Sequence, residues 1–239
     1  MNRYQRILRA KAQSGFSLVE LFMTVAIMGM VAGAVFTVYR SHQRSHTAQE
    51  AVADMQQNIR AAMLVMLRDI REAGCDPTGR AEAGITLATP GVFQFTRDIG
   101  GDADHPNEAN GSLTDANENV AFGFSPADDV GRTGIADAGT ASLGRNTGGG
   151  FQPIADNIQA IEFRYILRDG TLTIRPNAAQ FPSIIGVQIS LLARAARPDP
   201  DYLDTGSYTT AAGTVWRPSS PDHFRRRLET LTVSLRNRL

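Results

Sequence analysis

The arrangement of hydrophobic and polar residues changes character at Pro77. Before it, an apolar run of about 23 residues covers positions 16–38, which is long enough to span a bilayer. Beyond that run, small and apolar residues recur every three or four positions from Ala48 to Ala73, the spacing of one face of an amphipathic helix. Gly74 and Pro77 then supply a helix stop. We therefore predict one helix over 16–73, whose first half needs lipid or other helices and whose second half needs a sheet to pack on.

After Pro77 the pattern becomes that of short strands separated by loops. Alternating or continuous apolar residues predict strands at 85–88, 92–96, 120–124, 158–167, 171–175, 184–195 and 224–235. Stretches rich in Gly, Asn, Asp or Pro predict loops at 98–137, 144–150 and 197–220. The near-continuous apolar content of 184–195 favours a central strand. The predicted fold class is α+β, with a long N-terminal helix packed on an antiparallel β-sheet.

Composition narrows the function classes. Of the 239 residues, 42% are hydrophobic, enough for a core of ordinary domain size beside the helix. Residues 1–15 hold four of the 24 basic residues and no acidic one, so the remainder has 20 basic and 24 acidic residues and a formal charge of −4. That balance does not favour a nucleic-acid-binding protein. The single cysteine, Cys75, excludes an intramolecular disulfide and is read as a small packing residue.

The N-terminal residues carry the strongest functional signal. A basic leader stops at Gly15, and the apolar run that follows contains one charged residue, Glu20. A carboxylate this deep in a membrane segment costs about 2.5–3.5 kcal/mol on insertion scales, so we expect it to have a partner. A cut after Gly15 would supply one, the positive amine of Phe16. The alternatives are a secretory signal peptide cut near the Ala-Gly-Ala of 32–34, and an uncut membrane anchor.

The start of the apolar run matches the pattern Gly-Phe-[Ser/Thr]-Leu-x-Glu at Gly15, Phe16, Ser17, Leu18 and Glu20. This motif resembles the class III signal of type IV pilins and type II secretion pseudopilins. The resemblance implies that a prepilin peptidase cuts between Gly15 and Phe16 and that the new amine of Phe16 is N-methylated. It also implies the same α+β arrangement that the hydrophobic pattern predicts.

A second resemblance is narrower. Four segments look like the PilW/PulJ (GspJ-like) branch of minor pilins: 70–74, 158–165, 187–194 and 224–237. The resemblance implies a minor pilin that joins a tip complex and primes type IV pilus assembly, and not an enzyme. Two other functions stay open, a minor pseudopilin of a type II secretion system and a pilus-tip adhesin or DNA-uptake subunit.

The expected partners follow from this resemblance. They are other minor pilins, the major pilin, the prepilin peptidase and the inner-membrane assembly platform, with no nucleic acid. The expected location is the inner membrane, as a single-pass protein with a periplasmic head, and then the tip of a pilus or pseudopilus. The expected organisation is a leader (1–15), a transmembrane and filament-core helix segment (16–38), the amphipathic half of that helix (39–76) and a β-rich head (77–239).

Glu20 has two possible partners in this interpretation. In a packed bundle its carboxylate neutralises the Phe16 amine of a neighbouring subunit and helps to set the axial register. The alternative is a pair with the amine of its own chain. Both keep the charge compensated, as an environment of low dielectric constant requires.

No cofactor is expected, with calcium as a weak alternative. Carboxylates are close together in the loop after residue 98 and are oxygen ligands of the kind that calcium prefers; the candidates are Asp102, Asp104, Glu108, Asp115 and Glu118. The segment departs from an EF-hand loop at its third ligand and at its glycine, so a solvated surface loop is the default.

The remaining candidates have two interpretations each. The run Arg225–Arg227 either binds phosphate or an acidic partner, or pairs with acids such as Asp222 and Glu229. Trp216 and Tyr208 form either an exposed contact patch or part of the core. His42 and His46 either form a metal pair, for which their helical spacing is suitable but a third ligand is missing nearby, or are solvated polar residues, which is the favoured interpretation. We find no catalytic motif.

Overall fold

The computed structural model describes residues 15–100 and 108–238. By its internal contacts the chain divides into two compact units, residues 1–48 and Gln49–Leu239, and each is described by itself. We call the second unit the head. The leader up to residue 14, and the candidates Asp102 and Asp104, lie outside the described residues.

A single helix, α1 (Leu18–Arg71), accounts for the N-terminal pattern and agrees with the prediction to within two residues at each end. It contains one window that is long and apolar enough to cross a membrane, judged by length and composition, and none of that window is buried within the chain. At its other end Gly74 takes the left-handed conformation (φ 72°), which a glycine adopts at little cost. Its N–H donates to the carbonyl oxygen of Thr96, which ties the end of the helix to the sheet.

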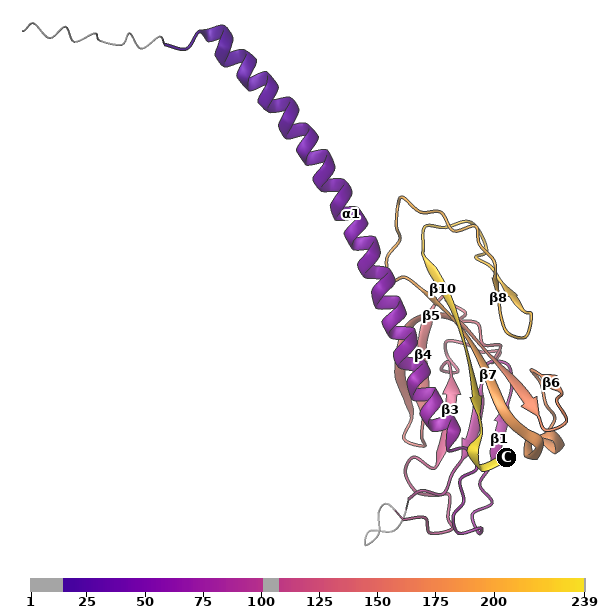
Figure 1. Ribbon diagram of the computed structural model, residues 1–239. Coiled ribbons are helices and arrows are strands. Elements are labelled where there is room, and N and C mark those ends of the chain that lie inside the picture. Colours follow the sequence, from indigo (N-terminus) through magenta and orange to yellow (C-terminus); the bar gives the residue numbers. More distant parts are fainter. Residues whose placement is uncertain (1–14, 101–107, 239) are drawn as a thin grey trace, which may run out of the picture. The chain divides into compact units, whose positions relative to one another are not determined.

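The head is built on one antiparallel sheet (Figure 1). Its strands are β1 (Ile85–Ala88), β2 (Phe93–Thr96), β3 (Asn119–Gly123), β4 (Ala141–Asn146), β5 (Phe151–Leu167), β6 (Leu172–Thr173), β7 (Ile184–Arg194) and β10 (Arg226–Ser234). They lie in the order β1-β2-β3-β4-β5-β7-β10, and β6 pairs with β5. A separate two-stranded ribbon is formed by β8 (Tyr208–Thr209) and β9 (Val215–Trp216), and two 3-10 helices occupy Ala178–Ser183 and Arg236–Arg238.

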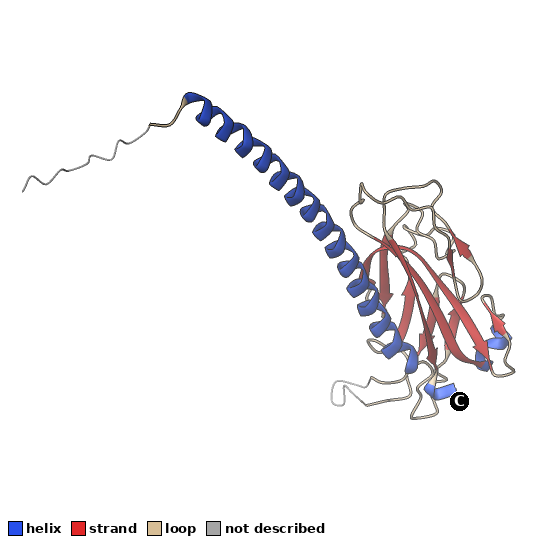
Figure 2. Ribbon diagram, turned by 45° about the horizontal axis from the view of Figure 1, so that its top comes forward, coloured by secondary structure: helices blue, strands red, loops and turns tan. Residues whose placement is uncertain are grey.

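The head's main core lies between the C-terminal half of α1 and one face of the sheet (Figure 2). The helix contributes a buried stripe with helical spacing: Met55, Ile59, Ala62, Met66 and Ile70. The sheet contributes aromatic side chains, and the ring centroid of Phe93 lies 5.5–5.9 Å from those of Phe95, Phe163 and Tyr165. Leu231 packs against this core and Val233 and Leu235 lie within it, as their alternation predicted.

The other face of the sheet is partly covered by the segment between β7 and β10. There Trp216 of β9 packs with Ala160 of β5 and Leu192 of β7 in a small second cluster. Because β7 is covered on both faces and flanked by β5 and β10, its side chains are buried almost continuously. The sequence predicted a central strand at 184–195; β7 is an internal strand, but it lies next to the edge strand β10 and not at the centre of the sheet.

Two of the predicted loops need correction. The segment 144–150 is not wholly loop, because β4 continues to Asn146 and leaves only residues 147–150 before β5 begins at Phe151. Gly144 suggested a turn, but it is a strand residue on which the Phe151 ring lies, and a Cβ at position 144 would overlap that ring. The predicted loop 197–220 contains the β8–β9 ribbon, whose two-residue strands are too short to leave a periodic signal.

Candidate functional site: the N-terminal segment and the charged networks of the head

The residues around the expected cleavage site precede the helix. Gly15, Phe16 and Ser17 are not helical, and α1 begins at Leu18. The Phe16 side chain is 87% exposed. The predicted scissile bond therefore lies in non-helical backbone directly beside the first helical turn.

Glu20 lies in that first turn and caps it. Its Oε2 accepts a hydrogen bond from the backbone N–H of Ser17 (3.2 Å), while the Ser17 hydroxyl oxygen accepts one from the N–H of Val19 (3.3 Å). This reciprocal arrangement resembles a capping box and satisfies donors that the start of a helix leaves free. A carboxylate in the first turn also interacts favourably with the helix dipole. In the uncut chain, the partner of Glu20 is thus the backbone of its own helix start.

The acidic loop uses its carboxylates to hold its own backbone. Glu118 is fully buried, and its two oxygens accept hydrogen bonds from the N–H groups of Ile99, Gly100 and Asp115. Asp98 is also fully buried and accepts from the N–H groups of Asn110 and Gly111. Sequence reasoning counted Glu118 as a possible calcium ligand. Its local role is to close the loop, which a pattern of acids alone does not reveal.

The two other calcium candidates within the described residues, Asp115 and Glu108, do not form a shared site. Asp115 accepts a hydrogen bond from the Asn110 amide (2.9 Å), and Glu108 is exposed. Within residues 15–100 and 108–238, no three His, Cys, Asp or Glu side chains come together as a metal-binding group. His42 and His46 lie on α1 at exposed positions.

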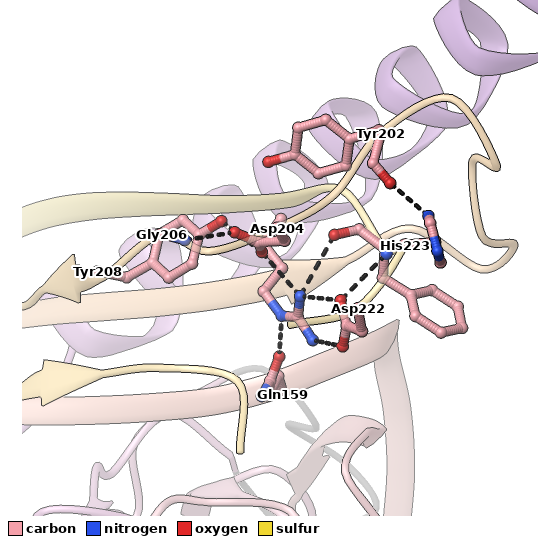
Figure 3. Close-up of polar contacts among 9 residues, drawn as sticks. Gln159, Tyr202, Asp204, Gly206, Tyr208, Asp222 and His223 are labelled. Atoms are coloured by element: carbon pink, nitrogen blue, oxygen red, sulfur yellow. Dashed lines mark hydrogen bonds and ion pairs between the residues drawn. The ribbon is translucent and has the colours of Figure 1, made fainter. Parts of the chain in front are cut away.

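The main charged network of the head surrounds Arg226, at the start of β10 (Figure 3). Its Nη1 donates to Asp204 (2.7 Å), its Nη2 donates to Asp222 (2.5 Å), and its Nε donates to the amide oxygen of Gln159 (2.7 Å). The side chains of Arg226 and Asp204 are only 2% and 1% exposed. Tyr208 donates its hydroxyl hydrogen to the same Asp204 carboxylate (2.8 Å). The network thereby ties the β7–β10 segment to β5 and β10.

The electrostatic consequences follow from these contacts. Hydrogen bonding to Asp222, followed by the opposing effect of burial, leaves the pKa of Arg226 above its usual value. The hydrogen bond from Arg226 holds the pKa of Asp222 below its usual value. Burial raises the pKa of Asp204, but the N–H of Gly206 and the Arg226 guanidinium outweigh it, so that the net pKa is lowered. All three groups are thus stabilised in their charged forms.

The arginine run is paired, as one of the two interpretations predicted. Arg225 binds Asp199 (2.7 Å), and its guanidinium lies over the Tyr202 ring at 4.5 Å from the centroid. Arg227 binds Glu229 (2.6 Å) in an exposed pair. The aromatic residues of this segment are also packed, since Trp216 is 8% exposed and Tyr208 packs beside it. The exposed-patch interpretation of Trp216 was therefore wrong.

A second network, which sequence reasoning missed, joins α1 to the sheet. Asp69 of α1 is buried and accepts from Arg97 (3.3 Å), which follows β2, and from Arg145 of β4 (2.5 Å). Arg97 also donates to Glu72 and to the carbonyl oxygen of Asn117. The only sequence signal was an acid beside the apolar stripe of the helix. Its partners, 28 and 76 residues away, required the tertiary structure.

Cys75 is a free thiol just after the helix, at an intermediate level of burial. Burial, and then the negative charges of Glu72 and Asp98, raise the pKa of the Cys75 thiol. A raised pKa lowers the thiolate fraction, so that the environment disfavours a reactive thiol.

The helix and the sheet together form one arrangement. A long helix that begins with an apolar candidate span, and whose C-terminal half packs on an antiparallel sheet, is the α+β arrangement that the resemblance to pilins implied. Residues 132–237 match the family model PilW, Type IV Pilus-assembly protein W. The match confirms the resemblance of this chain to the PilW branch of the type IV pilin superfamily.

The type IV-like pilin TTHA1219 from Thermus thermophilus is similar to this chain at 17% identity, with a TM-score of 0.42. The alignment covers 76% of this chain and 95% of that one. No match was found among curated proteins.

Proposed function

We propose that this chain is a minor pilin, which a prepilin peptidase processes and which then joins a tip complex that initiates type IV pilus assembly. The observation that carries the proposal is the start of α1. An accessible, non-helical Gly15–Phe16 bond directly precedes an apolar helix that has a single carboxylate, Glu20, in its first turn. The PilW match over 132–237 supports it independently, because it concerns the other end of the chain.

The physical mechanism is packing rather than chemistry. The N-terminal part of α1 has an apolar surface, and the free energy falls when lipid or other helices surround that surface. A cut after Gly15 creates a cation at Phe16, close to the carboxylate that already binds the Ser17 N–H. Pairing that cation with Glu20 of the same or a neighbouring subunit compensates both charges in the membrane and sets the register of the helices.

A null mutant scored for surface filaments tests the proposed role. We expect few or no filaments in the null strain and restoration by the wild-type gene. Gly15→Ala should accumulate as an uncut precursor, which mass spectrometry of the N-terminus detects. Normal filaments in the null strain would rule out an essential priming role, and an N-terminus other than methylated Phe16 would contradict the processing step.

Two substitutions at Glu20 separate charge from helix capping. Glu20→Gln keeps an oxygen that can accept the Ser17 N–H but removes the negative charge. Glu20→Ala removes both. If the charge sets the register, both variants should be processed and both should assemble poorly. If Glu20→Gln assembles as well as wild type, then the carboxylate acts only as a cap and the register role is wrong.

A further inference from the structure

The two edges of the main sheet are unequal. One edge is β1, with four residues, an irregular register between Ile85 and Leu87, and a proline shortly after its end. The other edge is β10, with nine residues that pair with β7 in an uninterrupted register from Arg226↔Arg194 to Ser234↔Gly186. Short or irregular edge strands resist further pairing, whereas a long regular edge invites it.

The free side of β10 can be assigned residue by residue. The N–H of Ala195 donates to the carbonyl of Arg225, and the N–H of Leu235 donates to the carbonyl of Ile185. In an antiparallel ladder the bonded residues alternate. The odd-numbered residues of β10 therefore bond to β7, and the even-numbered ones direct their N–H and C=O groups away from it. These include Thr230, Thr232 and Ser234.

The side chains along this edge suit strand pairing. The side chains of Thr230, Thr232 and Ser234 are exposed and uncharged. The strand contains no proline, and threonine is a residue that favours strands. The charged residues of the strand, Arg226, Arg227 and Glu229, lie at its beginning and pair with acids or with each other. The second half of β10 thus lacks the charges with which proteins usually protect an edge. Among the described residues, β7 is the strand that pairs with β10.

The direction of β10 limits what can occupy the edge. Asn58 of α1 donates to the carbonyl oxygen of Asp156, in the first half of β5. That part of β5 pairs with the end of β7, and the end of β7 pairs with the start of β10, so the three lie at the same end of the sheet. Further along, Asn237, just after β10, donates to the carbonyl of Glu72 just after α1 (3.4 Å). Within the head, β10 and the C-terminal half of α1 therefore run in the same direction.

A second copy of the chain fits this edge poorly. Every neighbouring pair in the sheet is antiparallel, and six pairings separate β1 from β10, so that both edge strands run in the direction of α1. Antiparallel pairing of either edge with β10 of another copy would run the two α1 segments in opposite directions. Chains anchored in one membrane favour the same direction, which leaves only the weaker parallel pairing.

We propose that the free edge of β10 binds an antiparallel strand from a different pilin-type subunit, one whose own edge strand runs opposite to its helix. The identity of the partner class rests on the proposed function, which places such subunits beside this chain. The backbone groups of Thr230, Thr232 and Ser234 supply the hydrogen bonds, a mode of recognition known as strand addition.

Site-specific photo-crosslinking of the full-length chain in its own cells tests the proposal. A benzoylphenylalanine residue replaces Thr232 on the edge or, as a control, the 45% exposed Leu172 of β6. We expect an adduct from position 232, mapped by mass spectrometry to a strand of a different protein with the same type of N-terminal signal. Position 172 should not give that adduct.

Two variants at Thr230 show whether backbone pairing is responsible. Thr230→Pro removes an N–H that points away from β7, so that the internal ladder loses no donor, whereas Thr230→Val keeps this N–H. We expect the adduct to fall about tenfold with proline, equivalent to about 1.4 kcal/mol, and to persist with valine. If Thr230→Pro loses the wild-type pattern of protease resistance, Thr230→Lys replaces it and should also reduce the adduct.

Several results would overturn the proposal: no adduct from position 232, an adduct to a second copy or to a loop, or equal yields with proline and valine. Filaments are scored in the same strains. Loss of filaments in the null mutant together with no adduct would refute strand addition and leave the priming role standing. Normal filaments in the null mutant would refute the priming role, whatever the crosslinking result.

Discussion

Residues 18–48 and 49–71 belong to one helix, yet different things stabilise them. In the first segment the apolar side chains are exposed, as Val31 (56%) and Phe36 (59%) illustrate. In the second, Ile59 and Met66 are at most 1% exposed because the sheet covers them. The second segment is thus stabilised by packing on the sheet within the head, whereas the first is buried only when lipid or other helices surround it. Substitutions in the head should change stability, and those in the N-terminal segment should change assembly.

The largest change in the free energy of unfolding should come from removing a buried charge in the head. Arg226→Met leaves Asp204, whose side chain is 1% exposed, without its cation. Removing one partner of a buried ion pair typically costs about 3–5 kcal/mol. Urea unfolding of the full-length protein in detergent measures the loss.

The neighbouring residue supplies the control. Arg227 and Glu229 form a pair with side chains 46% and 41% exposed. Exposed pairs contribute about 0–1 kcal/mol, so Arg227→Met should change the free energy of unfolding little. Equal effects of the two substitutions would show that burial does not decide the importance of these arginines.

Truncating an apolar side chain should affect stability in one half of α1 but not in the other. Met66→Ala removes a fully buried side chain, and such substitutions cost about 2–5 kcal/mol. Val31→Ala removes exposed methyl groups and should leave the unfolding of the head unchanged in detergent. A comparable loss from Val31→Ala would mean that the N-terminal half contributes to the folded head, and the comparison would fail.

Acid should weaken the head through the same network. The pKa values of Asp204 and Asp222 are lowered in the folded protein, relative to about 3.9 in an unfolded chain. Their contribution is therefore complete above that value and is lost as the pH falls through the lower folded pKa values. Comparing unfolding at pH 7 and pH 3 should show a smaller difference in Arg226→Met than in wild type. An equal difference would assign the acid sensitivity to other groups.

The smallest expected effect is at the start of the helix. Ser17→Ala removes the hydroxyl that accepts from the N–H of Val19, and loss of a cap costs about 1 kcal/mol of helix stability. Circular dichroism in detergent should show slight fraying of the N-terminal half, with unchanged unfolding of the head. A shift in head unfolding would indicate that the two segments are coupled.

Much of the fold follows from local sequence patterns. The helix limits and the strands at β1, β2, β5, β7 and β10 were predicted, because their side chains repeat with the period of their own backbone. The segment around Gly144 was misjudged, since its strand character depends on pairing with β5 and on the Phe151 ring that covers it. Its neighbours along the chain carry no sign of that pairing.

The sequence by itself was enough to predict a long helix that carries a single charged residue in its apolar run, and a last strand with alternating apolar and polar side chains. Only the tertiary structure decided that Asp69 would meet Arg97 and Arg145, that Arg226 would be buried between two aspartates, and that β10 would lie at a free edge. The reason is that periodicity records which side of an element is apolar. Ion pairs and strand neighbours instead depend on residues far apart in the chain, which come together only when the sheet has formed.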